Sequence, residues 1–252
     1  MSNCLSEAQR AIRASVCMAS YRGARYIGEQ IDSILVQLGP ADELIIVDDD
    51  SGDDTVEIIR AVKDSRIRLI VVAANQGYVR SFEQAVLASS GAFVFLADQD
   101  DLWVPGRLEL MIESLGHSGV VASNFTVLGG GSRGGVPKLK TQDSTHYLRN
   151  ILGTVIGYRP YYGCAMAMTR DQAQIFAPIP RYLVESHDLW LALCGNVGKT
   201  MTHLAEPTLL RRLHEENVTP RGWRSLGTIL RARIMILRAL AEAARRTRAA
   251  RR

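Results

Sequence analysis

The sequence predicts an α/β fold in which a Rossmann-like, mainly parallel sheet is flanked by helices. Short apolar runs alternate with helical patterns over the first hundred residues, and two of these runs end in clusters of aspartates. Alternation of this kind implies right-handed crossovers between parallel strands. Because ligands bind beyond the carboxyl ends of such strands, both acid clusters are expected at one edge of the sheet.

Four strands are predicted in the first half, where apolar runs are short and suited to burial on both faces. These strands are residues 14–19, 44–47, 67–72 and 93–97. Apolar side chains at helical spacing predict the helices between them. These helices are residues 26–37, residues 55–62 and one that contains residues 81–87.

The second half is less regular. Pro105 is expected in the first turn of a helix, where proline is well tolerated. Further helices are predicted at residues 187–194 and 226–252, and strands at residues 119–127, 163–168, 200–204 and 208–213. The glycine-rich segment 129–137 has few side chains that can pack, so it is predicted to be a flexible surface loop.

The length of 252 residues and the hydrophobic content of 47% allow one sizeable core. We expect a catalytic domain over residues 1–220, with a nucleotide-binding half at about residues 14–104 and an acceptor half at about 105–220. A basic C-terminal helix or tail would follow at residues 221–252.

A cytoplasmic location is expected. The N-terminal residues lack the apolar run of a signal peptide, and no apolar stretch is long enough to span a bilayer. The four cysteines are scattered, and Cys17 and Cys164 lie in apolar runs, which favours buried free thiols in a reducing compartment.

The charge is distributed unevenly along the chain. From residue 221 onward there are ten arginines and one acid, a net charge of +9, which leaves −5 for the rest given the total of +4. The segment after residue 226 also carries an apolar stripe. A helix packed on the body and a peripheral contact with anionic lipids at the inner face of the membrane are both consistent with this pattern. Nucleic-acid binding is disfavoured because the tail lacks aromatic stacking residues.

Asp98, Asp100 and Asp101 form the acid cluster after the fourth predicted strand. Adjacent carboxylates repel one another, and Mg²⁺ or Mn²⁺ bound among them would relieve this repulsion while bridging to substrate phosphates. An acidic turn that caps the following helix is the alternative.

Asp48 and Asp49 follow the second predicted strand, where carboxylates can accept hydrogen bonds from a nucleobase or from ribose hydroxyls. For the following residues, 53–55, a turn and helix cap are preferred.

His187 and Asp188 begin a predicted helix, and Asp188 could accept a proton from a hydroxyl. Helix capping is the alternative. Arg211, Arg212 and His214 follow a strand and could neutralise a diphosphate or complete a metal shell.

Seven motifs, in this order, resemble glycosyltransferase family 2, and the last three resemble its bacterial rhamnosyltransferase-like branch in particular. The resemblance extends from about residue 14 to residue 217. The motifs are ASYRG (19–23), EQIDSI (29–34), IVDDDS (46–51), NQG (75–77), LADQDDLW (96–103), YGCAM (162–166) and HDLW (187–190).

The resemblance implies a glycosyltransferase A-type fold and a set of donor-binding residues. By motif, Ser20 and Tyr21 would line the nucleotide pocket, and Asp48 and Asp49 would hold the base and ribose. Asp98 would also contact the donor nucleotide.

The resemblance further implies an inverting mechanism and a divalent cation, Mn²⁺ or Mg²⁺. Asp98 and Asp100 would form the DxD-type metal pair, and His214 would approach the metal or the diphosphate. Asp188 would be the general base. Diphosphate-side or acceptor-side candidates are Arg211, Arg212, Trp190 and His187.

Two departures from the family pattern carry expectations. Asp50 stands where the family often has glycine, so the turn is expected to reach positive φ less readily. The Gln-x-x-Arg-Trp motif of processive synthases is absent, which favours addition of a single sugar.

The expected reaction moves a sugar from a nucleoside-diphosphate donor, dTDP-rhamnose or a UDP-sugar, to a glycan or lipid-linked acceptor in bacterial surface polysaccharide or glycolipid assembly. A sugar nucleotidyltransferase is the alternative enzyme, although residues 22–25 resemble its usual glycine-rich basic loop only faintly. A non-catalytic protein that binds sugar nucleotides is the alternative outside enzymes.

Overall fold

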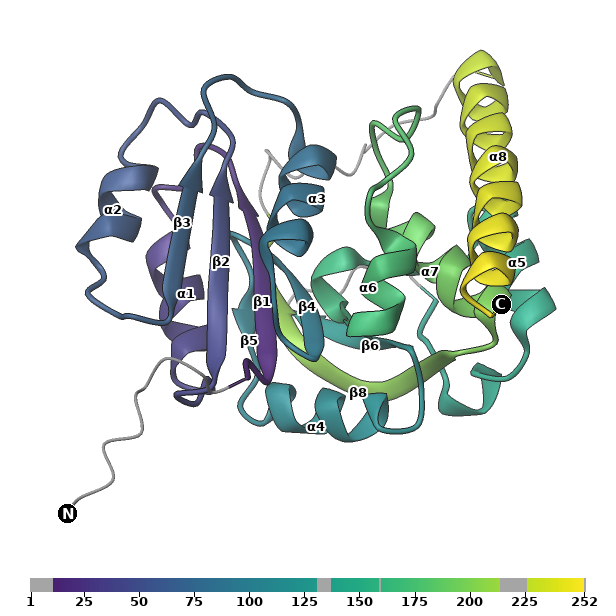
Figure 1. The fold of residues 1–252 in the computed structure, drawn as a ribbon, viewed down its shortest axis with the longest axis horizontal. Coiled ribbons are helices and arrows are strands. Elements are labelled where there is room, and N and C mark those ends of the chain that lie inside the picture. Colours follow the sequence, from purple (N-terminus) through teal and green to yellow (C-terminus); the bar gives the residue numbers. More distant parts are fainter. Residues whose placement is uncertain (1–10, 131–136, 159, 214–225, 252) are drawn as a thin grey trace.

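The computed structural model describes residues 11–130, 137–158, 160–213 and 226–251, with a mixed sheet at its centre (Figure 1). The order of the eight strands in the sheet is β3-β2-β1-β4-β7-β6-β8-β5. The strands are β1 (Ala14–Ser20), β2 (Asp42–Asp48), β3 (Ile67–Val71), β4 (Phe93–Asp98), β5 (Leu102–Trp103), β6 (Val120–Val127), β7 (Met166–Thr169) and β8 (Met201–Arg211).

The first four strands form the parallel half, as the sequence predicted. β1 lies between β2 and β4 and is parallel to both. Ser20 at the end of β1 is in register with Asp48, and Ala19 is in register with Asp98. The two acid clusters therefore meet at the carboxyl edge of the sheet, on either side of β1.

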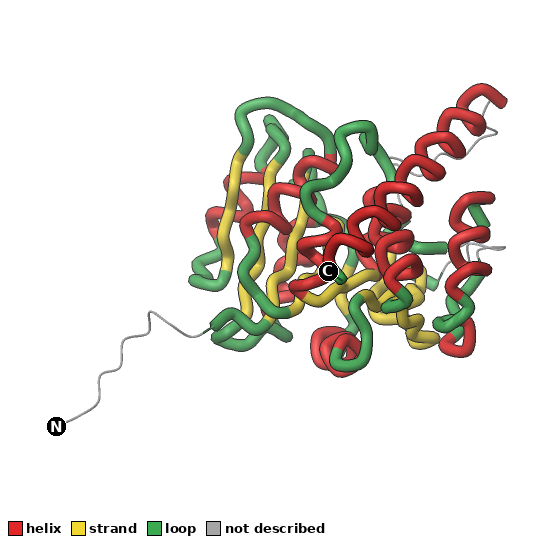
Figure 2. Tube along the Cα trace, turned by 45° about the vertical axis from the view of Figure 1, so that its right-hand side comes forward, coloured by secondary structure: helices red, strands yellow, loops and turns green. Residues whose placement is uncertain are grey.

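Helices cover both faces of the sheet (Figures 1 and 2). On one face, apolar side chains from α1 (Ile27–Leu35), α2 (Thr55–Ala61) and α4 (Arg107–Leu115) form one core. On the other face, a second core takes its side chains from α3 (Tyr78–Ala88), α5 (Tyr147–Ile156), α6 (Arg170–Phe176), α7 (His187–Gly198) and α8 (Leu226–Ala250). Successive residues of β1 supply opposite cores, Val16 and Met18 one and Cys17 the other.

The second half of the chain differs from the prediction in three places. Of the strand predicted at residues 163–168, Gly163–Ala165 is a 3₁₀ turn, and only Met166–Thr169 is a strand, paired antiparallel with β4 and β6. The strands predicted at residues 200–204 and 208–213 are one strand, β8, which pairs with β6 through two register shifts. α5, α6 and the two-residue β5 were not predicted. Residues 131–136 of the predicted glycine-rich loop lie outside the described residues.

The long C-terminal helix was predicted and is part of the same fold. Its side chains at helical spacing, Ile236, Ala239 and Ala243, are buried in the core shared with α7. Arg246 donates hydrogen bonds to the carbonyls of Ile175 and Pro178, at 2.9 and 2.7 Å. Among the described residues, no helix combines the length and apolar character that crossing a membrane requires.

Candidate active site

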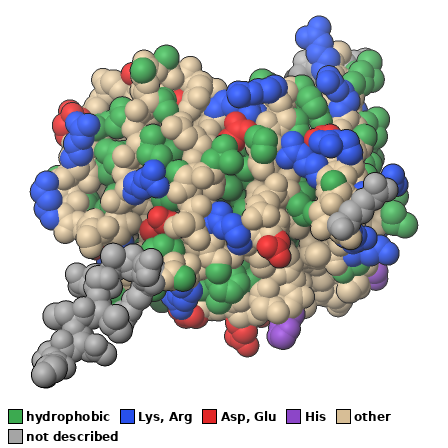
Figure 3. All heavy atoms as spheres, in the orientation of Figure 1, with side chains coloured by type: hydrophobic (Ala, Val, Ile, Leu, Met, Phe, Trp, Pro, Cys, Tyr) green, Lys and Arg blue, Asp and Glu red, His purple; other side chains and the backbone are tan. Residues whose placement is uncertain are grey.

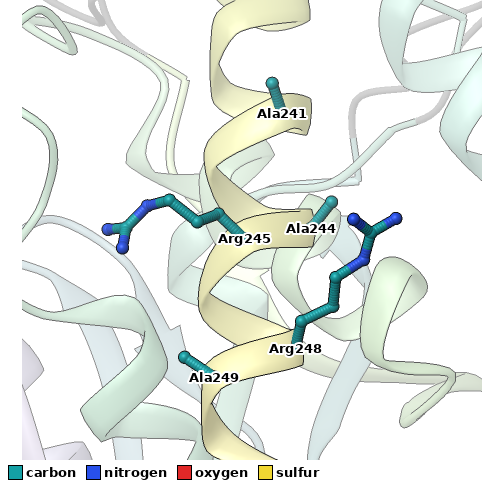
Figure 4. A pocket seen from close by; sticks show the side chains of 5 residues that line it. All are labelled: Ala241, Ala244, Arg245, Arg248 and Ala249. Atoms are coloured by element: carbon teal, nitrogen blue, oxygen red, sulfur yellow. The ribbon is translucent and has the colours of Figure 1, made fainter.

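A cavity of about 940 Å³ opens at the carboxyl edge of the sheet. Its walls come from the segments after β1 and β4, from α3, from the start of α7, from the end of β8 and from one side of α8. A smaller hollow on α8 is lined by Ala241, Ala244, Arg245, Arg248 and Ala249 (Figure 4). One helix supplies all of its walls, and none of these residues is an acid or a nucleophile, so the larger cavity is the candidate site.

Three carboxylates lie at the end of β4. Asp98 and Asp100 line the cavity, and Asp101 lies beside them, 2% exposed. Burial raises the pKa of Asp98 to about 6, with the charge of Asp100 adding to the rise and Arg211 opposing it. Burial, with the charges of Asp98 and Asp100, raises the pKa of Asp101 to about 8. Ionising all three carboxylates together is therefore unfavourable unless a cation compensates their charge.

Cys164 joins this cluster through a contact that the sequence did not reveal. Ligand atoms of Asp98, Asp101 and Cys164 lie within 4.8 Å of one another. One carboxylate oxygen of Asp101 accepts the backbone N–H of Arg212 at 3.1 Å, while Oδ2 is buried without a hydrogen-bond partner among the described residues. Oxygen ligands with one unsatisfied buried oxygen fit a divalent cation.

Arg211 is the positive group at the cavity wall, at the end of β8. Its guanidinium lies 4.5 Å from the ring centroid of Tyr162 and 5.3 Å from that of Phe125. These aromatic contacts fix the orientation of a side chain that is only 9% exposed, and its Nη1 has no hydrogen-bond partner among the described residues. An anion entering the cavity would meet a preoriented donor.

Asp188 enters the cavity from the first turn of α7. The residue before the helix, Ser186, has a left-handed backbone conformation with φ of 65°, and its N–H donates to the hydroxyl of Tyr78 at 3.1 Å. Burial raises the pKa of Asp188 to about 6; the N–H of Leu189, at 2.8 Å from Oδ1, opposes the rise, and the charge of Asp98 adds to it. Asp188 is thus ionised at neutral pH but holds a proton more readily than an exposed aspartate.

His187 lines the cavity beside Asp188 and is held by aromatic rings. Its imidazole stacks on Phe82 at a centroid distance of 4.3 Å and meets Tyr78 edge-on at 5.5 Å. Burial lowers the pKa of His187 to about 3, so the ring is neutral. A Cβ at Gly163 would overlap the imidazole Nε2, so only glycine fits beneath the ring.

The two aspartates after β2 have different positions. Asp48 is fully buried and accepts hydrogen bonds from the hydroxyls of Ser20 (2.9 Å) and Ser51 (2.5 Å) and from the N–H of Ser51. Asp49 lines the cavity, and its carboxylate accepts the N–H groups of Gln76 and Gly77 at 2.9 and 2.8 Å. The structure thus brings Asp49 to the cavity and leaves Asp48 beneath it.

The turns at this edge are tied together by Gln99. Its Oε1 accepts the N–H of Tyr21 at 2.8 Å and its Nε2 donates to the carbonyl of Tyr21 at 2.9 Å. Tyr21 and Ser20 both line the cavity. Asp50, expected to resist positive φ, adopts a φ of 62°, so that expectation was wrong. Aspartate is among the residues that tolerate this region best.

Besides Asp48, three of the predicted site residues are not seen at the cavity. Trp190 is buried in the core, where its indole N–H donates to the carbonyl of Phe176 at 2.9 Å. Arg212 lies outside the cavity lining and bonds the acidic turn to α1, donating to the carbonyl of Asp100 at 3.1 Å and to Glu29 at 2.6 Å. His214 lies outside the described residues.

Comparison with known proteins agrees with the motifs. A family model described as Glycosyl transferase family 2 matches residues 15–173. The chain is 34% identical over 101 residues to the Escherichia coli UDP-Glc:alpha-D-GlcNAc-diphosphoundecaprenol beta-1,3-glucosyltransferase WfgD, covering 40% of each chain. It is 35% identical over 101 residues to the putative teichuronic acid biosynthesis glycosyltransferase TuaG of Bacillus subtilis, covering 39% of this chain and 40% of that one. Such matches span about a third to two fifths of these relatives.

Solved structures share the fold over most of the chain. Staphylococcus aureus TarS 1–349 in complex with UDP-GlcNAc aligns with a TM-score of 0.70 and 18% identity, covering 93% of this chain and 72% of that one. Glucosyl-3-phosphoglycerate synthase of Mycobacterium tuberculosis, solved with Mn²⁺, UDP and phosphoglyceric acid, aligns with a TM-score of 0.61 and 21% identity, covering 92% and 78%. The family model covers well over half of the chain, including the strands that carry both acid clusters, and the chain therefore belongs to glycosyl transferase family 2.

Proposed function

We propose that this protein is an inverting, metal-dependent glycosyltransferase that adds one sugar from a nucleoside-diphosphate donor to an acceptor hydroxyl. One observation carries the proposal: Asp188, the Asp98/Asp100 pair and Arg211 line the same cavity. A base for the acceptor, a cation site and an anion-binding group are what transfer from a sugar diphosphate requires.

The donor nucleotide is proposed to lie against Tyr21 and Asp49. Both line the cavity, and Asp49 is held rigid by the two backbone N–H groups that it accepts. Ser20 lies between this wall and Asp48, whose oxygens bind Ser20 and Ser51. Asp48 then acts by fixing the turn rather than by touching the nucleotide. The UDP-bound relatives of the same fold support a UDP-sugar, and dTDP-rhamnose is the proposed alternative donor.

The diphosphate is proposed to lie between Arg211 and the acid pair. Arg211 donates hydrogen bonds from a guanidinium already oriented by Tyr162 and Phe125. Asp98 and Asp100 would hold Mn²⁺ or Mg²⁺, which when bound stabilises negative charge on the departing diphosphate. The buried Oδ2 of Asp101, which has no hydrogen-bond partner in the described part of the chain, supports a cation at this place.

Asp188 is proposed to take the proton of the acceptor hydroxyl as it attacks the anomeric carbon. Attack from the face opposite the diphosphate inverts the configuration, through a transition state resembling an oxocarbenium ion. A pKa of about 6 leaves Asp188 ionised at neutral pH while making it a stronger base than an ordinary aspartate. The neutral ring of His187 is proposed to help position the acceptor beside it.

The acceptor is proposed to be a glycan or lipid-linked intermediate of a bacterial surface polysaccharide. The names of WfgD and TuaG point to a diphosphoundecaprenol-linked sugar and to teichuronic acid. Three buried free thiols, Cys17, Cys164 and Cys194, support a reducing, cytoplasmic setting.

A thermal-shift screen of nucleoside diphosphates and sugar nucleotides, with and without Mn²⁺, should identify the donor, and product analysis should then define the reaction. Release of nucleoside diphosphate, dependent on acceptor and abolished by a chelator, is the expected result. Release of pyrophosphate would assign the chain to the nucleotidyltransferases instead. Nuclear magnetic resonance of the new linkage tests inversion.

A further inference from the structure

Two neighbouring helices expose an apolar surface, which we name the α5/α8 apolar face. On α5, Leu148, Leu152 and Ile156 are spaced by one helical turn each. On α8, Leu230, Ile234 and Leu237 form a similar stripe. These six side chains are between 51% and 78% exposed. The two helices are in direct contact, since the Arg233 guanidinium donates to the carbonyl of Ile156 at 2.8 Å.

No similar concentration of exposed apolar side chains is found elsewhere on the described surface. Exposed apolar residues elsewhere, such as Val36 on the end of α1 and Leu87 on α3, are not arranged as paired helical stripes. Large contiguous apolar patches mark sites of association. A helix with an apolar face and a strongly basic flank is typical of a peptide segment that lies in a membrane interface.

The charges around the face decide which partner it suits. α5 contains no acid, and α8 carries six arginines against one acid, Glu242. Glu242 is bound by Arg245 and Arg246, at 2.7 and 2.8 Å. In Figure 3, Lys and Arg side chains gather on the side of the molecule where α8 lies, with hydrophobic side chains along the same edge. Two copies of such a surface would repel each other, whereas an anionic lipid leaflet would attract it.

We propose that the α5/α8 apolar face docks on an anionic lipid leaflet, with its leucines and isoleucines in the interfacial region and its arginines among the headgroups. Arg149 on α5 has a side chain that is 68% exposed, although its Nη1 also lies 3.5 Å from Asp143, and Arg231 on α8 is exposed; both are suited to this role.

The α5/α8 apolar face adjoins the cavity, so a membrane contact there would bring the lipid surface close to the proposed active site. Gly157, directly after α5, and Ala232 and Arg233 on α8 line the cavity that contains Asp188. A lipid-linked acceptor held in the leaflet would thus present its sugar next to the proposed base. This inference rests on the proposed function only for the use of the contact. Binding to membranes is measured without turnover, so a protein that does not bind vesicles can be told apart from one that does not catalyse the proposed reaction.

Sedimentation with vesicles tests the apolar contact. The protein should bind vesicles of phosphatidylglycerol and phosphatidylcholine, and the double variant Leu152→Glu, Ile156→Glu should bind about a hundredfold more weakly, because each side chain loses burial worth on the order of tenfold in affinity. Leu87→Glu is the control: Leu87 is 61% exposed, close to the 63% and 67% of Leu152 and Ile156, but lies on α3, so this variant should bind like the wild type. Unchanged thermal unfolding shows that each variant is folded.

Charge variants test the lipid class. Arg149→Gln and Arg231→Gln should each lower binding about fivefold, whereas Arg60→Gln on α2 should not, and vesicles of phosphatidylcholine alone should bind weakly. Equal binding of the Leu152→Glu, Ile156→Glu variant and the wild type, or no binding to anionic vesicles, overturns the proposal. A dimer in light scattering that this variant dissociates also overturns it and assigns the face to a second copy.

Discussion

Replacing Asp188 with asparagine should stabilise the protein. The pKa of Asp188 is raised from 3.8 to about 6, chiefly by burial. Since one pKa unit corresponds to about 1.4 kcal/mol, the ionised carboxylate costs up to about 3 kcal/mol of folding free energy at neutral pH. Asparagine removes the charge, keeps the shape and can still accept the N–H of Leu189, now 2.8 Å from Oδ1. For a domain of this size the gain corresponds to about 6–12 °C in melting temperature.

The difference in stability between Asp188→Asn and the wild type should depend on pH. The native pKa of about 6 lies above the unfolded value of about 3.9, so the native state binds the proton more tightly. The cost to the wild type is therefore full above pH 6 and disappears below about pH 4. Denaturant unfolding at pH 7.5 should favour Asp188→Asn, and at pH 4 the two proteins should have nearly equal free energies of unfolding.

The same substitution should remove catalysis. Loss of a positioned base typically lowers turnover by about 10²–10⁴-fold, while nucleotide affinity by calorimetry should be unchanged. Asp42→Asn is a control of opposite sign. Burial raises the pKa of Asp42, but hydrogen bonds from Arg13, Gly39 and Ala14 lower it to below the usual value. Loss of this carboxylate should therefore destabilise the protein. If Asp188→Asn turned over at the wild-type rate, or were less stable at pH 7.5, the reasoning would be refuted.

Three further predictions concern the rest of the site. Gly163→Ala should place a Cβ against the imidazole of His187, and it should lower turnover and also lower the free energy of unfolding by about 1–3 kcal/mol. Gly28→Ala in α1 is the control, since its Cβ would lie 3.8 Å from Ile58. In thermal unfolding this variant should be more stable by about 0.5–1 kcal/mol. Arg211→Lys keeps the charge but loses the aromatic stacking, so calorimetry should show roughly tenfold weaker binding of nucleoside diphosphate, and equal affinity would argue against its role. Mn²⁺ affinity, measured by calorimetry, should fall as the pH drops from about 8 to below about 6, because Asp101 and then Asp98 take up protons over this range, and Asp98→Asn should weaken binding and reduce this pH dependence without removing it.

The parallel half of the sheet could be predicted because its strands are short apolar runs buried on both faces. The 3₁₀ turn at Gly163–Ala165 could not, because an apolar run of six residues is equally compatible with a strand. α5 escaped prediction since its outward face is itself apolar, which removes the polar stripe that marks a surface helix. β5 has two residues and no period to recognise.

Within the site, the sequence predicted that the acid clusters lie at the carboxyl edge of the sheet, but it could not predict which side chains line the cavity. Asp48 and Asp49 are adjacent, and only their hydrogen bonds distinguish the buried one from the one at the cavity. Trp190 follows Asp188 by two positions on α7, which rotates it by about 200° to the opposite side of the helix and into the core. Cys164 meets the acids because it lies in the 3₁₀ turn that leads into β7, the strand that pairs with β4.

The side of α8 that carries Ala232, Arg233, Met235 and Ile236 also closes the chamber in which the reaction is proposed to occur. Truncation before Leu226 would therefore remove part of the cavity wall together with the basic helix. The cavity would then be open to solvent, and water would compete with the acceptor for the sugar. Shortened versions designed for crystallisation or expression should keep the whole helix, because α8 forms part of the cavity wall and so limits access to the site.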